Sequence, residues 1–320
     1  MSIAPSPSWV AIPEDADFPT VLDFLVQRFP RMNPEIWIRR LREGKVQDGD
    51  GRTVTAGDPC VPHTRLRYFR EAENEPRIPF RERIVYRDDH LLVADKPHFL
   101  PVVPAGRYVS ECLVYRLRAA TGEPELTPVH RLDRATAGLV LCSLRRDTRG
   151  PYTRLFATRA VDKEYLAVTR ITGRSPSGGP SPPETRRWTV EDRLERGTPP
   201  FLSRRGPGPP NATTHLELLA HRESLAVFRV RPTTGKKHQI RFHLADLGFP
   251  ILHERYYPEL LPEAPLDFTR PLQLLARRLT FRDPVTGEQR SFVSSRRLAW
   301  DFRERRGAPA PPASPEQPLE

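Results

Sequence analysis

The residues best placed to do chemistry lie in one short stretch, HRLDRATAGLVL, residues 130–141. It sets one carboxylate, Asp133, between the guanidinium groups of Arg131 and Arg134, directly before an apolar run that predicts a buried strand. A loop held by such a strand can keep a carboxylate fixed and partly dry, so Asp133 could act as a nucleophile if it stays ionised. From these residues alone, however, an ion pair of Asp133 with Arg131 or Arg134 is the simpler interpretation.

This stretch resembles H-R-L-D-x-x-T-S-G-L-L-L, the signature of the RluA-type pseudouridine synthases, in which the aspartate is the nucleophile. Ala137 stands where serine is usual, a change from one small residue to another. The resemblance implies that Asp133 is catalytic and that the chain is an isomerase acting on uridines in RNA. Because that isomerisation involves no net oxidation, it implies no cofactor and no metal, and the sequence shows no G-x-G-x-x-G, G-x-x-x-x-G-K-[ST] or H-E-x-x-H motif.

Two further segments resemble motifs of the same family. Val161–Tyr165 matches its K-x-Y element, whose tyrosine stacks on the target base and is implicated as general base; without the resemblance, Tyr165 would be taken for a core aromatic. TGKKHQIRFHL, residues 234–244, resembles T-G-R-x-H-Q-I-R-x-H-L, whose arginine pairs with the aspartate. The resemblance thus assigns catalytic roles to Asp133, Tyr165 and Arg241, with Arg241 projecting from a helix and keeping Asp133 charged.

The flanking segments extend the resemblance to roughly residues 83–295. ERIVYRDDHLLVADKPHFLPV, residues 82–102, is similar to the strand pair that ends in Lys-Pro and opens the catalytic domain. RPLQLLARRLTFRDPVTGE, residues 270–288, is similar to the closing segment, with Leu275 where histidine is usual. Lys236 also replaces a usual arginine, which keeps the charge but loses the two-pronged grip on an anion.

RNA contacts are expected from several side chains around these motifs. A target uridine must leave its stack before an enzyme can reach it, and Arg131 matches the arginine that enters the vacated position. A salt bridge is the structural alternative for Arg131, and a loop hydrogen bond is the preferred interpretation of His130. The full set of expected RNA-binding residues is His130, Arg131, Arg134, Lys96, Lys163, Lys237, His238 and Gln239.

Two other functions compete with this hypothesis. A non-catalytic RNA-binding protein could keep the same scaffold, but the matched residues Asp133, Tyr165 and Arg241 argue against it. A glycosidase-like hydrolase would also use a carboxylate at a sugar, but it needs a second carboxylic acid. The matched segments offer arginine and tyrosine instead.

The composition fits an enzyme that meets a polyanion. The chain has 320 residues, 51 Lys and Arg against 40 Asp and Glu, and a formal net charge of +11, which favours RNA as partner, ribosomal or transfer RNA by resemblance. Its three cysteines are far apart, so neither a disulfide framework nor a zinc site is expected. The N-terminus shows no signal peptide and no apolar run long enough for a membrane helix, so we expect a cytoplasmic protein, by default a monomer.

The order of predicted elements indicates an α+β fold with a mixed, largely antiparallel sheet, because strands outnumber helices and mostly follow one another directly. We expect a loose tail at 1–16, a small helical module at 17–70, a linker at 71–82, the catalytic domain at 83–303 and a disordered tail at 304–320. Exposed, basic loops are expected at 174–184 and 196–211. Ser110 is expected to cap a helix that ends at Gly122.

The module at 17–70 resembles the alpha-L RNA-binding module that precedes many bacterial pseudouridine synthases. Its second helix is predicted from Asn33 as N-cap, Pro34 in the first turn and Gly44 after the end. Candidate recognition residues are Arg39, Arg40, Arg42 and Lys45. A small helical cap on the catalytic domain is the alternative interpretation.

Overall fold

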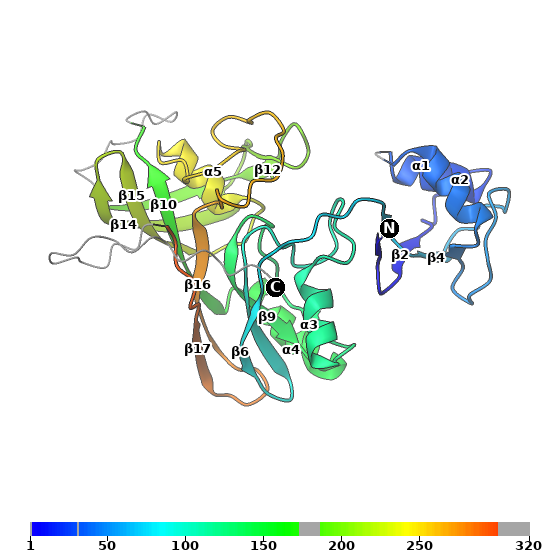
Figure 1. Cartoon of the computed structure of the whole chain (residues 1–320), viewed down its shortest axis with the longest axis horizontal. Helices are drawn as coiled ribbons and strands as arrows, with labels where there is room; N and C mark the ends of the chain where they lie inside the picture. The colour runs from blue at the N-terminus through cyan, green and yellow to red at the C-terminus, as the bar shows by residue number, and fades with distance from the viewer. Residues whose placement is uncertain (1, 31, 173–185, 300–320) are drawn as a thin grey trace. The chain divides into compact units, whose positions relative to one another are not determined.

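The computed structural model describes residues 2–30, 32–172 and 186–299, which divide into two compact units (Figure 1). The first unit comprises residues 1–76 and 104–111, and the second comprises residues 77–103 and the chain from Cys112 on. The boundary at Pro76 falls within the expected linker, but the return of Pro104–Glu111 to the first unit was not expected. The predicted loop at 174–184 and tail at 304–320 lie outside the described residues.

Two capped helices form one layer of the first unit. Helix α1 (Val21–Arg28) begins at Thr20, which exchanges hydrogen bonds with Asp23 in a capping box. Helix α2 (Pro34–Arg42) begins at Asn33, whose side chain accepts from the amide of Glu35. The helices pack on a sheet of order β2-β4-β3, formed by β2 (Ser8–Ala11), β4 (Arg65–Tyr68) and β3 (Val46–Gln47). A separate pair joins β1 (Ser2–Ile3) to β5 (Glu71–Ala72).

The prediction of a loose tail over residues 1–16 is wrong. Strand β2 pairs with β4 along its whole length, and Val10 and Ile12 are buried in the core of the first unit. The Pro- and Ser-rich composition hid a strand too short to show a clear alternation of apolar and polar residues.

Three of the four basic candidates of this unit lie beside carboxylates. Arg40 is buried beside Glu71 at 3.3 Å, Lys45 binds the same carboxylate at 2.5 Å, and Arg39 lies 3.7 Å from Glu73. Asp and Glu slightly outnumber Lys and Arg in residues 1–76 and 104–111, so the positive charge of the chain resides in the second unit.

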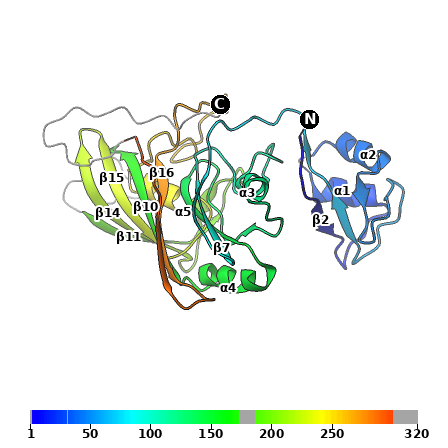
Figure 2. The ribbon, with the colours of Figure 1, turned by 60° about the horizontal axis from the view of Figure 1, so that its bottom comes forward.

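The second unit is built on a ten-stranded sheet, viewed from another side in Figure 2. Its main order is β11-β14-β15-β10-β16-β9-β7-β6, with β17 added beside β16 and β8 beside β9. Only the pair of β9 and β16 is parallel among the described strands, which confirms a mixed, largely antiparallel sheet. The bounds are Arg83–Arg87 (β6), Leu91–Lys96 (β7), Thr127–Pro128 (β8), Ala137–Ser143 (β9), Val161–Arg170 (β10), Arg187–Asp192 (β11), Ala212–Arg222 (β14), Leu225–Pro232 (β15), Leu274–Arg282 (β16) and Gln289–Val293 (β17).

A close approach of two strands explains one glycine of the sequence motif. Gly138 in β9 has a φ of +116°, and a Cβ there would lie 2.3 Å from the carbonyl oxygen of Ala276 in β16. No other residue type can let the strands meet at this distance.

Three helices accompany the sheet. Helix α5 (Gln239–Asp246) packs Ile240 and Leu244 into a core with β10, β11, β14 and β15. Helix α4 (Arg146–Ala157) was not predicted, because Gly150 and Pro151 interrupt it; its buried Tyr152 packs with β7, β9, β16 and β17. Helix α3 (Leu113–Thr121) ends at Gly122 as predicted.

Two local predictions are corrected. The N-cap position of α3 is Cys112, not Ser110, whose amide and hydroxyl instead donate to Glu75. The segment 196–211 is not all loop, because β12 (Leu194–Arg196) pairs with β13 (Ser203–Arg205) in a short hairpin. None of the described helices is long and apolar enough to cross a membrane.

Candidate active site

Asp133 lies in the loop between β8 and β9, where its carbonyl accepts a hydrogen bond from the amide of Thr136 and closes a turn. Its side chain keeps 30% of its surface exposed. The strand that follows, β9, is buried along its whole length, so the C-terminal end of the loop is anchored to a rigid element.

Two buried side chains support this loop from the end of β7. The ammonium of Lys96, fully buried, donates to the carbonyls of Pro97, Leu100 and Arg134 at 2.9, 2.8 and 3.3 Å. The ring of His98 bonds the carbonyl of Ala135 at 2.8 Å. The expectation that Lys96 contacts RNA is not supported, because its ammonium is buried and holds the main chain at Pro97, Leu100 and Arg134, next to Asp133.

Arg241 reaches Asp133 from α5. Its Nη1 lies 3.4 Å from Oδ2 of Asp133, and only 4% of its side chain is exposed. Burial alone would lower the pKa of Arg241, but hydrogen bonds to Glu254, with the charges of Glu254 and Asp133, raise it instead. The residue thus stays charged, although it is buried rather than projecting out of the core as expected.

Glu254 holds the other edge of this guanidinium. Nε of Arg241 donates to one carboxylate oxygen at 2.7 Å and Nη2 to the other at 2.6 Å. No part of the matched motifs includes Glu254, so sequence reasoning missed it. The one available signal was chemical: an arginine buried on α5 needs a carboxylate partner, but a sequence does not say which.

Tyr165 lies on β10, at a bulge in the pairing of β10 with β16 between Glu164 and Tyr165. Such bulges redirect side chains and are common beside active sites. Burial, and then the charge of Asp133, raise the pKa of Tyr165 above its usual range. The phenol is therefore protonated at neutral pH and lies within electrostatic reach of Asp133.

His238 also lies beside Asp133 rather than on the surface. It is buried, its Nδ1 bonds the hydroxyl of Tyr257 at 2.9 Å, and its Nε2 is 3.9 Å from Asp133. Burial lowers the pKa of His238 to about 4, so the ring is neutral at pH 7. The expectation that His238 contacts RNA is not supported, because the side chain is buried.

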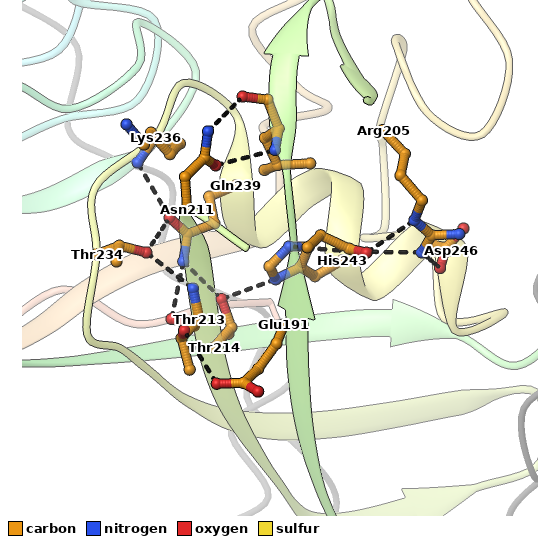
Figure 3. A network of polar contacts seen from close by, with 12 residues as sticks. Glu191, Arg205, Asn211, Thr213, Thr214, Thr234, Lys236, Gln239, His243 and Asp246 are labelled. Carbon is orange, nitrogen blue, oxygen red and sulfur yellow. Dashed lines mark hydrogen bonds and ion pairs between the residues drawn. The ribbon is translucent and has the colours of Figure 1, made fainter. Parts of the chain in front are cut away.

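Gln239 proves to be a structural clamp (Figure 3). Its side-chain oxygen accepts from Thr234 and from the amide of Lys236, and its side-chain nitrogen donates to Thr213 and Thr214 on β14. The loop that precedes α5 is thereby tied to the sheet, and Gln239, 3% exposed, has no surface to offer RNA.

The other expected RNA contacts divide by exposure. Arg131 and Lys237 are exposed and Arg134 is half-buried. Lys163 donates to the carbonyl of Thr234 at 2.9 Å, and burial lowers its pKa to about 8. His130 accepts a hydrogen bond from the amide of Leu141 at 3.0 Å and stacks on Phe156. It therefore holds its own loop, in agreement with the loop hydrogen bond preferred for it from the sequence.

In the described ranges, no group of three or more His, Cys, Asp or Glu side chains is arranged to hold a metal ion. The site brings together the carboxylate of Asp133, the guanidinium of Arg241 with the carboxylate of Glu254 behind it, and the protonated phenol of Tyr165.

Comparisons with known proteins identify the family of the chain. A family model described as RNA pseudouridylate synthase matches residues 90–246. An uncharacterised RNA pseudouridine synthase of Synechocystis sp. is 31% identical over 242 residues, 74% of this chain and 79% of the relative. The dual-specificity RNA pseudouridine synthase RluA of Escherichia coli (strain K12) is 32% identical over 229 residues, 69% of this chain and 96% of the relative.

Solved structures show the same fold. Human RNA pseudouridylate synthase domain containing 4 is 26% identical, with a TM-score of 0.50 over 67% of this chain and 88% of that one. Its relative, domain containing 1, is 23% identical, with a TM-score of 0.54 over 69% and 86%, a likeness of fold. The chain belongs to the RluA-type RNA pseudouridine synthases, isomerases that convert uridine in RNA to pseudouridine.

Proposed function

We propose that this protein isomerises specific uridines in ribosomal or transfer RNA, with Asp133 as the nucleophile. One observation carries the assignment: Asp133 is part-exposed toward solvent while the buried Arg241 lies behind it at 3.4 Å. A nucleoside can approach the exposed side of the carboxylate, and Arg241 holds the carboxylate from the other side through a charge-assisted contact.

The chemistry can then proceed without a cofactor. A carboxylate oxygen of Asp133 bonds to C1′ of the ribose as the bond from C1′ to N1 breaks, and the electron pair of that bond leaves with the uracil. The base turns, C5 bonds to C1′, and the ester electrons return to Asp133. One proton is lost from C5 and one is gained at N1, so the reaction balances without oxidant or reductant.

Tyr165 is our candidate to move this proton. Its phenol can give its proton to N1 and take one from C5. One of the two causes that raise its pKa is the negative charge of Asp133. That charge is absent while Asp133 is bonded to the sugar, so the phenol gives up its proton more easily at that stage. The charge returns once C5 has bonded to C1′, which makes the phenolate a stronger base for the C5 proton. A ring at this place can also stack on the uracil.

Exposed cations around the site suit an RNA substrate. Arg131 lies in the same loop as Asp133, and its guanidinium can fill the gap left by a uridine turned out of its stack, an event that costs a few kcal/mol. Lys237 can contact phosphate. We place the reaction in the cytoplasm, where ribosomal and transfer RNA are found. A monomer is sufficient for it, because Asp133, Tyr165 and Arg241 come from one chain.

Replacement of Asp133 by Asn tests the proposal. The Asp133→Asn protein should fold and bind RNA but form no pseudouridine, whereas Asp162→Asn, an exposed carboxylate on β10, should act like wild type. Carbodiimide mapping of RNA from cells that express each form, in a strain lacking the gene, measures the product and names the uridine. Equal pseudouridine signals from the Asp133→Asn and wild-type forms would refute the assignment, and no signal from wild type would favour the non-catalytic alternative.

A further inference from the structure

We infer that Glu254 is the permanent counter-ion of Arg241 and positions it against Asp133, an inference that rests on the proposed role of Asp133. Arg241 lies between two carboxylates, but its short contacts, at 2.6 and 2.7 Å, are both to Glu254, and its contact with Asp133 is 3.4 Å. The Glu254 side chain is 2% exposed, against 30% for Asp133. The buried pair is therefore Glu254 with Arg241, and Asp133 is the outer partner.

The carboxylate of Glu254 is itself held by the main chain. Its Oε1 accepts from the amides of Arg255 and Tyr256 at 2.9 and 2.8 Å, in addition to Nη2 of Arg241. The preceding residue, His253, has a φ of +66° and bonds the carbonyl of Pro271 through its ring. A non-glycine residue in this conformation is strained and persists where its surroundings fix it. The turn thus aims Glu254 at a set position.

The same strand that carries Tyr165 places this turn. The amide of Leu252 bonds the carbonyl of Val168 on β10 at 2.8 Å, and Ile251 bridges Thr169. Because β10 carries Tyr165 as well, the proton-moving phenol and the support of Arg241 share one rigid element.

A third contact restricts the guanidinium further. Its Cζ lies 4.6 Å from the ring centre of Tyr256, so one face is covered while Glu254 occupies the edge formed by Nε and Nη2. Nη1 is the donor that remains directed at Asp133. The other titratable neighbour of Asp133 on this side, His238, is neutral at pH 7 and adds no charge.

A permanent counter-ion keeps Arg241 paired at the stage of the reaction when Asp133 loses its charge. While Asp133 is ionised, the three groups carry one net negative charge, which favours a developing positive charge at C1′. When Asp133 bonds to C1′ its charge is lost, and Arg241 would become an unpaired buried cation if Asp133 were its sole partner. An uncompensated buried charge is strongly unfavourable. With Glu254 in place, the pair stays neutral while the nucleophile is occupied.

Kinetics of Glu254→Gln, measured on a purified RNA transcript that wild type modifies, test the inference. We expect kcat to fall about 100-fold, the loss typical of a misplaced charge-stabilising group, with KM for RNA unchanged. Glu254→Asp keeps the charge on a shorter arm, so it should restore part of kcat. Glu259→Gln, an exposed residue of the same segment, is the matched control.

A purely structural role would lower the yield of folded protein but leave the kcat of the folded fraction unchanged. The inference is overturned if Glu254→Gln keeps wild-type kcat per folded molecule, or if kcat falls and Glu254→Asp recovers none of it.

Thermal unfolding supplies a second readout that needs no product. Glu254→Gln and Arg241→Met should each lower Tm by on the order of 10 °C, since each strands a buried charge, and the double variant should be no less stable than the worse single one. Additive losses would show that the two residues are not a pair. If the two losses of Tm are not additive but wild type forms no pseudouridine, the proposed function is wrong and the ion pair of Glu254 with Arg241 is still supported. If wild type forms pseudouridine but the losses are additive, only the role of Glu254 as counter-ion is wrong.

Discussion

The ammonium of Lys96 donates a hydrogen bond to the main-chain carbonyl of Arg134, 3.3 Å away and one residue after the proposed nucleophile. Lys96 comes from the end of β7, and the strand paired with it, β9, begins directly after the nucleophile loop. The Lys-Pro pair of the opening segment is thus a support for the active-site loop rather than a contact for RNA.

Replacement of Lys96 by Met should separate these two roles. The carbonyls of Pro97, Leu100 and Arg134 would each lose a charged donor in a buried site, so we expect unfolding free energy to fall by about 2–4 kcal/mol. Urea unfolding measures this loss. The kcat should fall more than the RNA affinity does, and a variant that lost affinity alone, at full stability, would contradict the role.

The exposed cations Arg131 and Lys237 should show the opposite behaviour. Arg131→Ala and Lys237→Ala should leave Tm unchanged but weaken RNA binding, and each lost phosphate contact should reduce the slope of log K against log salt by about 0.7–0.9. Filter binding at several salt concentrations gives this slope. Arg146→Ala, an exposed arginine on α4, serves as control and should keep the wild-type slope.

The hydroxyl and the ring of Tyr165 can be tested separately. Tyr165→Phe keeps a stacking surface but removes the proton, so we expect kcat to fall about 10²–10⁴-fold with little change in RNA affinity. Tyr165→Ala should lose affinity as well. Single-turnover rates with saturating enzyme distinguish the two; a Phe variant at wild-type rate would assign the proton transfer elsewhere.

Acid should destabilise the protein through its buried histidines. Burial lowers the pKa of His130 from 6.5 to about 3, so the unfolded chain binds this proton first as pH falls. The stabilising contribution is complete above pH 6.5 and declines between pH 6.5 and about 3, by up to about 1.4 kcal/mol per pH unit. Urea unfolding from pH 7 to 5 should show a smaller slope for His130→Gln than for wild type, while His221→Gln, at an exposed site, should leave the slope unchanged.

Gly138 should tolerate no side chain. In Gly138→Ala the new Cβ would meet backbone atoms of Ala276 at 2.3–2.8 Å in a conformation that alanine rarely adopts, so we expect destabilisation of about 4 kcal/mol or more, or failure to fold. Gly57→Ala has open space around its Cβ and should be close to neutral. Soluble yield and circular dichroism compare the two variants.

Local signals predicted the elements that are determined locally. Asn33 caps α2 and Gly122 ends α3, as their residue types predicted. Helix α4 escaped prediction because Pro151 removes a backbone donor, a cost offset by the tertiary packing of Tyr152.

The site was predictable where the motifs name its residues, and Asp133 and Arg241, 108 positions apart, do lie together. The roles of buried residues were not predicted correctly. A sequence shows the charge of Lys96 and the amide of Gln239, but it does not show the main-chain groups that these side chains bind. Glu254 was missed for the same reason, since the partner of a buried cation is chosen by the fold.

The position of β16 has a consequence for synthesis of the chain. This strand, residues 274–282, lies between β9, which follows the loop of Asp133, and β10, which bears Tyr165. The two halves of the sheet are therefore joined by a strand that leaves the ribosome after all the site residues. A nascent chain that already contains Asp133, Tyr165, Arg241 and Glu254 still lacks the strand that sets them in register, so the site cannot be complete before residues 274–282 have been translated.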